Sequence, residues 1–486
     1  MWADQLPQPC YLRNLRELSI WWCDNLKYLL SSAFARNLVQ LEKLNMFACW
    51  GMEEIIVIKE PTVTFDYSDE LDIIEFPKLK EIRLDVIARL IQFCSQSQGQ
   101  GREQLLFADS ATLDVRNCKS LKKIVVKEES GDGIRSQKIC FPALKILEIS
   151  KLPNLEKFCA GDHIECLFLE ALIIKDCPKL NTFVSNSTDK AVPEETDMIS
   201  GARQPLFSNQ KVTLPKMRIL KLEKCNSVIE IWDDDDTKER GQQSAAAAGR
   251  SRSAIFQSLE FLRVSKCGRL NKLLEANSSS SFENLTVLEV SECERMEYLF
   301  TPSASKTLVL LKKMGVSKCQ AMTEIIASSP EVDHDDKLLS FDNLELLVLQ
   351  SLPSLTSFHM GNCTLEFPKL SRVVVVGSCP ELRSFCGHGT IITPKLRTFV
   401  RRQRWIHFDI SVGEDADGQI TVHDMWFDSF AADEKEHNIE NGGNIDINTT
   451  IQQFWVNHYA DYEDIVEEDI DKDNTEDYLW IEGWQY

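Results

Sequence analysis

A short apolar pattern recurs along most of the 486-residue chain: leucine-x-x-leucine-x-leucine, followed three residues later by cysteine. One copy begins at Leu15 and continues with Leu18, Ile20 and Cys23. The last two apolar positions of each copy alternate with their neighbours, and a period of two is that of a β-strand with one buried face. The pattern therefore predicts one short strand per copy, with its apolar side chains facing a shared interior.

Twelve such copies occur; Leu-Pro replaces the cysteine in two of them, and Ile87 replaces it in a third. The final apolar residue of each predicted strand marks the position of the copy. These marker residues are Ile20, Met46, Leu84, Val115, Ile149, Ile174, Leu222, Val264, Val290, Val316, Leu349 and Val375. Five of the eleven gaps between markers are 25 or 26 residues, which is a leucine-rich-repeat period, and each longer gap is one unit plus an insertion.

The fold class that this repeat predicts is an α/β leucine-rich-repeat solenoid. We expect a curved horseshoe with a parallel β-sheet on its concave face and short helices and irregular loops on its convex face. A single coil cannot bury its apolar residues alone, whereas stacked coils form one continuous core. Nine of the sixteen cysteines follow a predicted strand, where a small, weakly polar thiol suits a buried corner. We expect these thiols to be reduced and packed inside.

Changes in composition divide the chain into three parts. Residues 1–404 form the array of about twelve repeats, and polar insertions within it are expected to be loops on the outer face. Residues 405–460 are acidic but rich in aromatics, and their alternating segments predict one or two strands that cap the last coil. Residues 461–486 form an acidic tail that we expect to be disordered. The insertions span about 59–75, 128–140, 185–213, 233–255 and 328–340.

The formal net charge of −21 lies almost entirely in residues 405–486, where 22 acidic residues face only Lys435 and Lys472. The repeat region is nearly neutral, so we expect no nucleic-acid partner. No stretch approaches 18 uninterrupted apolar residues, and we expect no membrane span. The first residues contain no secretory signal, and with reduced cysteines this predicts a cytoplasmic protein.

Two sequence motifs imitate metal sites, and both are incomplete. Cys159, His163 and Cys166 supply three ligands where a structural zinc site needs four. The acidic segment from Asp469 resembles a calcium loop, but Asn474 replaces the required glycine and Trp480 the required glutamate. The histidines are scattered, and no triad can be identified. We therefore expect no catalytic, cofactor-binding or metal-binding residues, and no enzyme.

Three segments of the chain resemble a known family. Residues 169–183 read LEALIIKDCPKLNTF, a repeat unit similar to those of plant intracellular immune receptors. The MEEII segment at 52–56, followed by FPKL at 76–79, resembles one branch of these receptors, as does DINTTIQQ at 446–453. The chain from about residue 10 to 455 thus resembles the C-terminal leucine-rich-repeat region of coiled-coil nucleotide-binding leucine-rich-repeat disease resistance proteins.

The resemblance implies a protein-recognition and autoinhibitory module that acts in the defense response. Its partner would be a pathogen effector, a guarded host protein or the nucleotide-binding domain of the receptor. The phosphate-binding pattern G-x-x-x-x-G-K-[ST] does not occur, so the nucleotide switch of the family is not assigned to this chain. Two alternatives remain: a substrate-binding adaptor of a ubiquitin ligase, and a truncated, non-signalling paralogue.

The candidate binding residues are those that flank the inward strand positions and therefore face outward on the concave sheet. Trp21 and Phe47 fall on adjacent coils, and neighbouring exposed aromatics are typical of a protein-binding hot spot or of a surface that packs on another domain. The candidates are Glu17, Trp21, Lys43, Phe47, Arg83, Asp85, Asp114, Arg116, Phe261 and Arg263.

Overall fold

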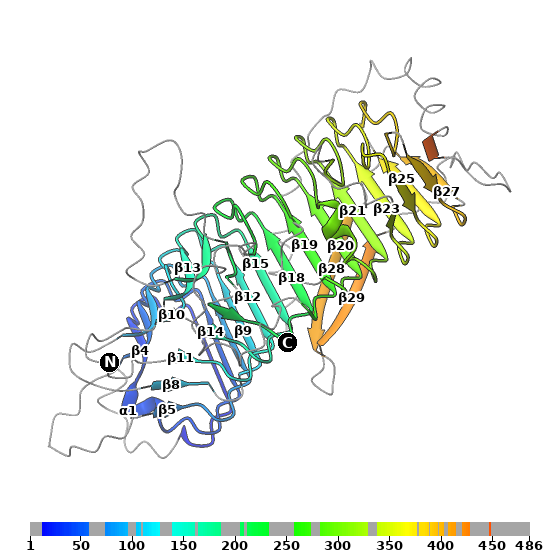
Figure 1. The fold of residues 1–486 in the computed structure, drawn as a ribbon. Coiled ribbons are helices and arrows are strands. Elements are labelled where there is room, and N and C mark those ends of the chain that lie inside the picture. The colour runs from blue at the N-terminus through cyan, green and yellow to red at the C-terminus, as the bar shows by residue number, and fades with distance from the viewer. Residues whose placement is uncertain are drawn as a thin grey trace, which may run out of the picture.

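The structure is a computed structural model, and its chain forms a curved stack of coils (Figure 1). Some segments between the coils, together with both ends of the chain, lie outside the described residues. The residues described are 12–57, 73–95, 104–107, 110–126, 139–160, 164–185, 205–208, 211–232, 257–273, 282–328, 338–376, 379–387, 389–396, 398–402, 407–414, 420–427 and 447–448.

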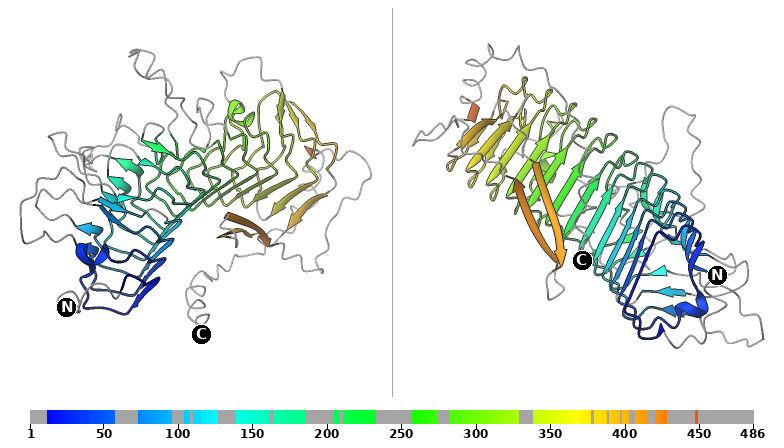
Figure 2. Two further views of the ribbon diagram at one scale, coloured as in Figure 1. Left: turned by 90° about the horizontal axis from the view of Figure 1, so that it is seen from below. Right: turned by 180° about the vertical axis from the view of Figure 1, so that it is seen from behind.

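A single thirteen-stranded parallel sheet runs the length of the stack and lines its concave side (Figure 2). Each strand contains five residues and pairs with the strand of the next coil. The strands are β1 (Glu17–Trp21), β3 (Lys43–Phe47), β6 (Glu81–Asp85), β9 (Thr112–Arg116), β12 (Ile146–Ser150), β15 (Ala171–Lys175), β18 (Ile219–Glu223), β19 (Phe261–Ser265), β20 (Val287–Ser291), β21 (Lys313–Ser317), β23 (Leu346–Gln350), β25 (Arg372–Val376) and β27 (Thr398–Arg402).

The pairing register confirms the predicted solenoid. All twelve marker residues occupy one row of the sheet, from Ile20 opposite Met46 to Leu349 opposite Val375. The row continues to Arg401 on β27, a thirteenth strand that the leucine pattern does not predict. Phe399 and Arg401 pair with Val373 and Val375, so the alternation of aliphatic residues ends here although the backbone pairing continues.

A left-handed residue turns the chain inward after eleven of the strands. Lys266, for example, has φ of 53° and donates its backbone N–H to the carbonyl of Ser291 in the next coil, at 2.9 Å. The bond extends the ladder by one residue before the chain leaves the sheet. The thiol of Cys267 then points into the core and donates to the carbonyl of Ser265. The same corner geometry repeats from coil to coil, which explains why cysteine recurs there.

The buried cysteines lead to a prediction about reactivity. Eight of the nine cysteines that follow strands are buried, and only Cys23 is half-buried; none of the thirteen cysteines whose state is described forms a disulfide. Burial raises the pKa of Cys118 and of Cys177 to about 12, and the thiolate is the reactive form. Titration with a thiol reagent at pH 7 should therefore leave at least those eight unlabelled in the native protein and label all sixteen after denaturation. Rapid labelling of Cys177 and Cys267 in the folded chain would contradict this packing.

The convex side contains short parallel strands and two four-residue helices within the described ranges, so regular helices are fewer than the sequence suggested. Return segments such as Ile55–Ile56 are short and β-branched, which favours extended structure. These elements are β2 (Tyr28–Ser31), β4 (Glu54–Val57), β5 (Ile73–Glu75), β7 (Gln92–Ser95), β8 (Gln104–Leu106), β10 (Val125–Val126), β11 (Ile139–Cys140), β13 (Lys157–Ala160), β14 (Ile164–Glu165), β16 (Thr182–Ser185), β17 (Val212–Thr213), β22 (Leu338–Ser340), β24 (Thr364–Glu366), β26 (Thr390–Ile392), α1 (Ser32–Ala35) and α2 (Pro302–Ser305).

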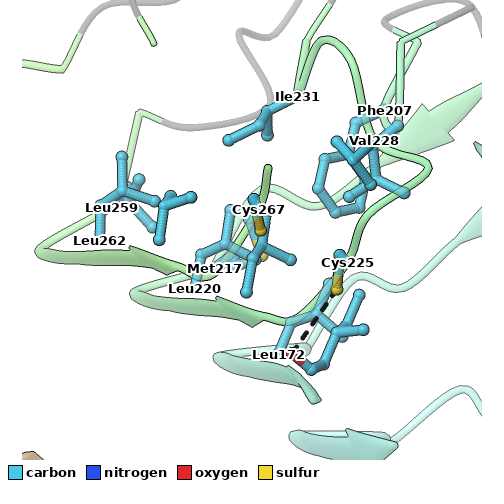
Figure 3. Close-up of a cluster of buried hydrophobic side chains, with 14 of the residues drawn as sticks. Leu172, Phe207, Met217, Leu220, Cys225, Val228, Ile231, Leu259, Leu262 and Cys267 are labelled. Carbon is cyan, nitrogen blue, oxygen red and sulfur yellow. Dashed lines mark hydrogen bonds between the residues drawn. The ribbon is translucent and has the colours of Figure 1, made fainter. Parts of the chain in front are cut away.

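One continuous apolar core fills the space between the two sides. Figure 3 shows part of it, where leucines of successive strands stack beside the cysteines of the corners. Phenylalanines form a second column toward the convex side: Phe107 stacks between Phe76 and Phe141, with ring centroids 5.4 and 4.9 Å apart. Because each ring packs on those of the coils before and after it, the coils are locked in one register.

The described residues after β27 lie in two different places on the solenoid. Strands β28 (His407–Glu414) and β29 (Ile420–Phe427) form an antiparallel hairpin that lies across the concave side of the middle coils (Figures 1 and 2). Ile447 and Asn448 reach the last coils instead: Ile447 is buried in the core, and the Asn448 side chain accepts a hydrogen bond from the N–H of Phe385 at 2.8 Å. Residues 461–486 lie outside the described part of the chain.

Candidate protein-binding surface

The outward residues of the concave sheet form three rows, because parallel pairing places equivalent strand positions side by side. The first row runs from Glu17 and Lys43 to Glu81, and the third from Trp21 and Phe47 to Asp85. The sequence-predicted candidates thus share one face. Glu17, Trp21, Lys43, Phe47 and Arg83 are exposed; Asp85, Asp114, Arg116 and Arg263 are half-buried; Phe261 is buried.

An exposed aromatic group occupies the N-terminal end of this face. We use "aromatic group" for Trp21, Trp22, Phe47 and Trp50, whose exposed fractions are 53%, 66%, 38% and 54%. Trp21 and Phe47 are direct neighbours in the third row, and the rings of Trp22 and Phe47 meet edge to face at 5.8 Å. Large aromatic side chains this open to solvent, and clustered, are characteristic of a protein-binding surface.

The corner of the chain presents Trp22 and Trp50. Trp22 has φ of 60°, so it is the left-handed residue of the first corner and projects from the sheet edge. Gly51 beside Trp50 cannot be replaced without rearrangement, because a Cβ there would lie 1.9 Å from the carbonyl oxygen of Asp24. Close packing of these two corners therefore holds both tryptophans at the surface. Trp22 and Trp50 lie outside strands β1 and β3, so the alternation within the strands does not by itself place them on this face.

Charged residues continue the surface beyond the aromatic group, and they neutralise one another. Glu81 pairs with both Lys43 and Arg83. One coil further, the Arg116 guanidinium lies 2.7 Å from Asp114 and 3.0 Å from Glu148 of the next strand. Pairs of opposite charge across coils create no strong field of one sign. In general, paired surface charges orient a bound partner more than they attract one from a distance.

Asp114 is the most perturbed of these groups. Burial raises the pKa of Asp114 from 3.8 to about 6; Arg116 opposes the shift and Glu148 adds to it. The folded chain therefore holds a proton at this carboxyl between pH 4 and 6, where the unfolded chain has released it. By linkage, the contribution of Asp114 to the free energy of unfolding falls as the pH rises through this window.

The Asp114→Asn variant tests this shift. Its free energy of unfolding, relative to wild type, should rise by up to about 3 kcal/mol between pH 4 and pH 7, since each pKa unit is worth about 1.4 kcal/mol. Arg116 keeps Glu148 as a partner in the variant. Denaturant titrations of both proteins at pH 4, 5, 6 and 7 measure the difference. A difference independent of pH would contradict the assignment.

The middle of the concave face is covered, which corrects the expectation that Phe261 is exposed. Phe261 is 4% exposed because the hairpin lies over it, and it shares an apolar cluster with Ala171, Ile219 and Ile420 of β29. The neighbouring Arg263 lies 3.6 Å from Glu289. The sequence contains one signal of this cover that was missed. The first-row residues are charged or polar in the first four coils and apolar in the next five.

Within the described ranges, no cluster of three or more histidine, cysteine, aspartate or glutamate residues is arranged to hold a metal ion. Cys159 and Cys166 are both buried, and His163 lies outside the described ranges. In that same part of the chain, none of the helices has the length and apolar character needed to cross a membrane.

The fold defines a leucine-rich-repeat solenoid whose concave face carries exposed aromatic residues at its N-terminal end. Residues 1–103, 102–194 and 200–320 match the family described as plant disease resistance protein RPS2-like, leucine-rich repeats. The chain belongs to this family, and it is a defense-related repeat module. The sequence matches no curated protein.

Proposed function

We propose that the chain is the protein-recognition and autoinhibitory module of a plant immune receptor, and that it acts in the cytoplasm without catalysing a reaction. The exposed aromatic group on the first two coils supports this proposal. Four large rings within two coils favour a partner that covers them. The buried thiols of the described corners form no disulfide, which suits a reducing compartment.

The partner that we favour is the nucleotide-binding domain of the receptor. Two observations concern the N-terminal end of the stack. First, the aromatic group is exposed. Second, the inward residues Leu18 and Ile20 of β1 are only half-buried, whereas the equivalent residues of β3, Leu44 and Met46, are buried. A domain that covered both would bury apolar surface in one contact. A pathogen effector or a guarded host protein would use the same rings through the concave side.

The test is binding between the purified chain and the nucleotide-binding domain of an RPS2-like receptor, measured by calorimetry and by co-elution. We expect saturable binding that is retained in high salt, because the contact is apolar and the charges beside it are already paired. Absence of binding to this domain, together with binding of an effector, would move the proposal to direct ligand recognition. Absence of both would refute it.

A further inference from the structure

An apolar strip crosses the middle of the concave sheet, where a solvated face would be polar. We define it by the first outward residue of five consecutive strands, β12 to β20: Ile146, Ala171, Ile219, Phe261 and Val287. The equivalent positions of the first four coils are Glu17, Lys43, Glu81 and Thr112. The strip is therefore a distinct surface and not a general property of the repeat.

The hairpin β28–β29 covers this strip. Ile420, the first residue of β29, is 5% exposed and packs on Ala171, Ile219 and Phe261. Val412 of β28 packs against the same cluster. Two aliphatic side chains of the hairpin thus contact the apolar strip.

Arg218, the residue before β18, adds a polar contact to the apolar one. Its guanidinium forms two hydrogen bonds with the carboxylate of Glu260, at 2.9 and 3.0 Å, and lies 3.5 Å from Glu170. Held in this way, it donates a further hydrogen bond to the backbone carbonyl of Ile420, at 3.4 Å. Any extended segment offers a backbone carbonyl to Arg218. This hydrogen bond therefore requires an extended backbone but no particular side chain.

The hairpin is joined to the sheet face and not to a sheet edge. Its two strands satisfy each other through eight consecutive residue pairs, from His407 with Phe427 to Glu414 with Ile420. Separation from the strip would break no hydrogen bond of the thirteen-stranded sheet. The hairpin can therefore leave while the solenoid stays folded.

We propose that the apolar strip and Arg218 form a second binding site, for an extended protein segment that carries a β-branched aliphatic residue, and that the hairpin is its tethered occupant. An incoming segment must displace the hairpin, which sets a threshold for binding. The proposal rests on the proposed function in one respect, namely that the partner which displaces the hairpin is a protein. The site is separate from the aromatic group.

The experiment uses the full chain with Ile420→Asp and a fluorescent peptide of residues 405–429 with the wild-type sequence. An aspartate against the apolar strip should release the tethered hairpin. The peptide should then bind the variant at least tenfold more tightly than the wild-type chain, whose site is filled. Adding Ile219→Asp to the variant should abolish this binding. The matched control is Ile91→Asp, at an exposed isoleucine outside the strip, which should bind the peptide as weakly as wild type.

A measurement on the wild-type chain supports or overturns the proposal even where a variant fails to fold. Hydrogen–deuterium exchange should show residues 407–427 opening at least tenfold faster than strands β18 to β20. Exchange of the hairpin together with the sheet, or equal peptide binding to wild type and Ile420→Asp, would overturn the proposal. The aromatic group takes no part in either measurement. A failure here therefore leaves the proposed function untouched, and a failure of domain binding leaves this site untouched.

Discussion

Replacing Ile447 with alanine should loosen the last coils of the solenoid at a cost of roughly 2–5 kcal/mol. Ile447 is 1% exposed and packs into the end of the core. The loss should be local, because each coil of a solenoid depends on its neighbours. Faster hydrogen–deuterium exchange at residues 372–387, with unchanged exchange at β1 to β6, is the expected observation.

The residue after Ile447 ends a ladder of backbone hydrogen bonds on the convex side. The N–H of Ile325 donates to the carbonyl of Phe358, and the N–H of Phe358 to that of Phe385. The N–H of Phe385 donates to the Asn448 side chain, whose amide oxygen replaces the carbonyl of a further coil. Asn448→Ala leaves this N–H without that acceptor and should cost about 1–3 kcal/mol.

The matched control for Ile447 is Ile392→Ala, because Ile392 lies on the same end of the array but is 41% exposed. Its effect should be within about 0.5 kcal/mol, as is usual for surface substitutions. Equal exchange at residues 372–387 in wild type and Ile447→Ala would mean that this residue does not close the core.

The second large effect should come from the pair Trp21→Ala and Phe47→Ala. Hot-spot aromatics each contribute about 2 kcal/mol or more to binding, so the double substitution should weaken binding to the nucleotide-binding domain at least ~30-fold. Trp21 is 53% and Phe47 38% exposed, and neither belongs to the buried core, so the melting temperature should change by only a few degrees. Calorimetric titration and thermal unfolding of the same samples separate the two effects.

Val309→Ala with Leu310→Ala is the control pair, since these residues are exposed to a similar extent but lie outside the concave strands. Their substitution should leave the affinity unchanged. A loss of affinity in both pairs would indicate a nonspecific apolar effect, and unchanged affinity in Trp21→Ala with Phe47→Ala would remove the aromatic group from the interface.

The repeat pattern predicted the coil because local and global requirements coincide in it. Each strand carries its own inward apolar residues, so the row from Ile20 to Val375 could be predicted one copy at a time. The thirteenth strand was not predicted, because Phe399 and Arg401 keep its backbone pairing without the leucine pattern. The convex strands were expected as helices and loops, since segments of three or four residues have too little periodicity to distinguish the two.

The candidate surface was less predictable, because exposure depends on contacts between distant segments. Nothing near Phe261 in the sequence indicates that Ile420 covers it. Nor does the DINTTIQQ segment reveal that Asn448 completes a hydrogen-bond ladder 63 residues away. Trp21 and Phe47 could be placed because they are direct neighbours in the sheet register. The apolar first row of the middle coils marks a covered face, but the sequence around it does not show which segment covers it.

The central claim is that the aromatic group is the open protein-binding surface of this chain. Hydrogen–deuterium exchange of the chain with and without the nucleotide-binding domain tests it most directly, because the method locates the contact. The account predicts slower exchange at residues 17–23 and 43–50 in the complex, and unchanged exchange at 261–265 beneath the hairpin. Protection confined to the middle or last coils, with residues 17–23 unaffected, would contradict it.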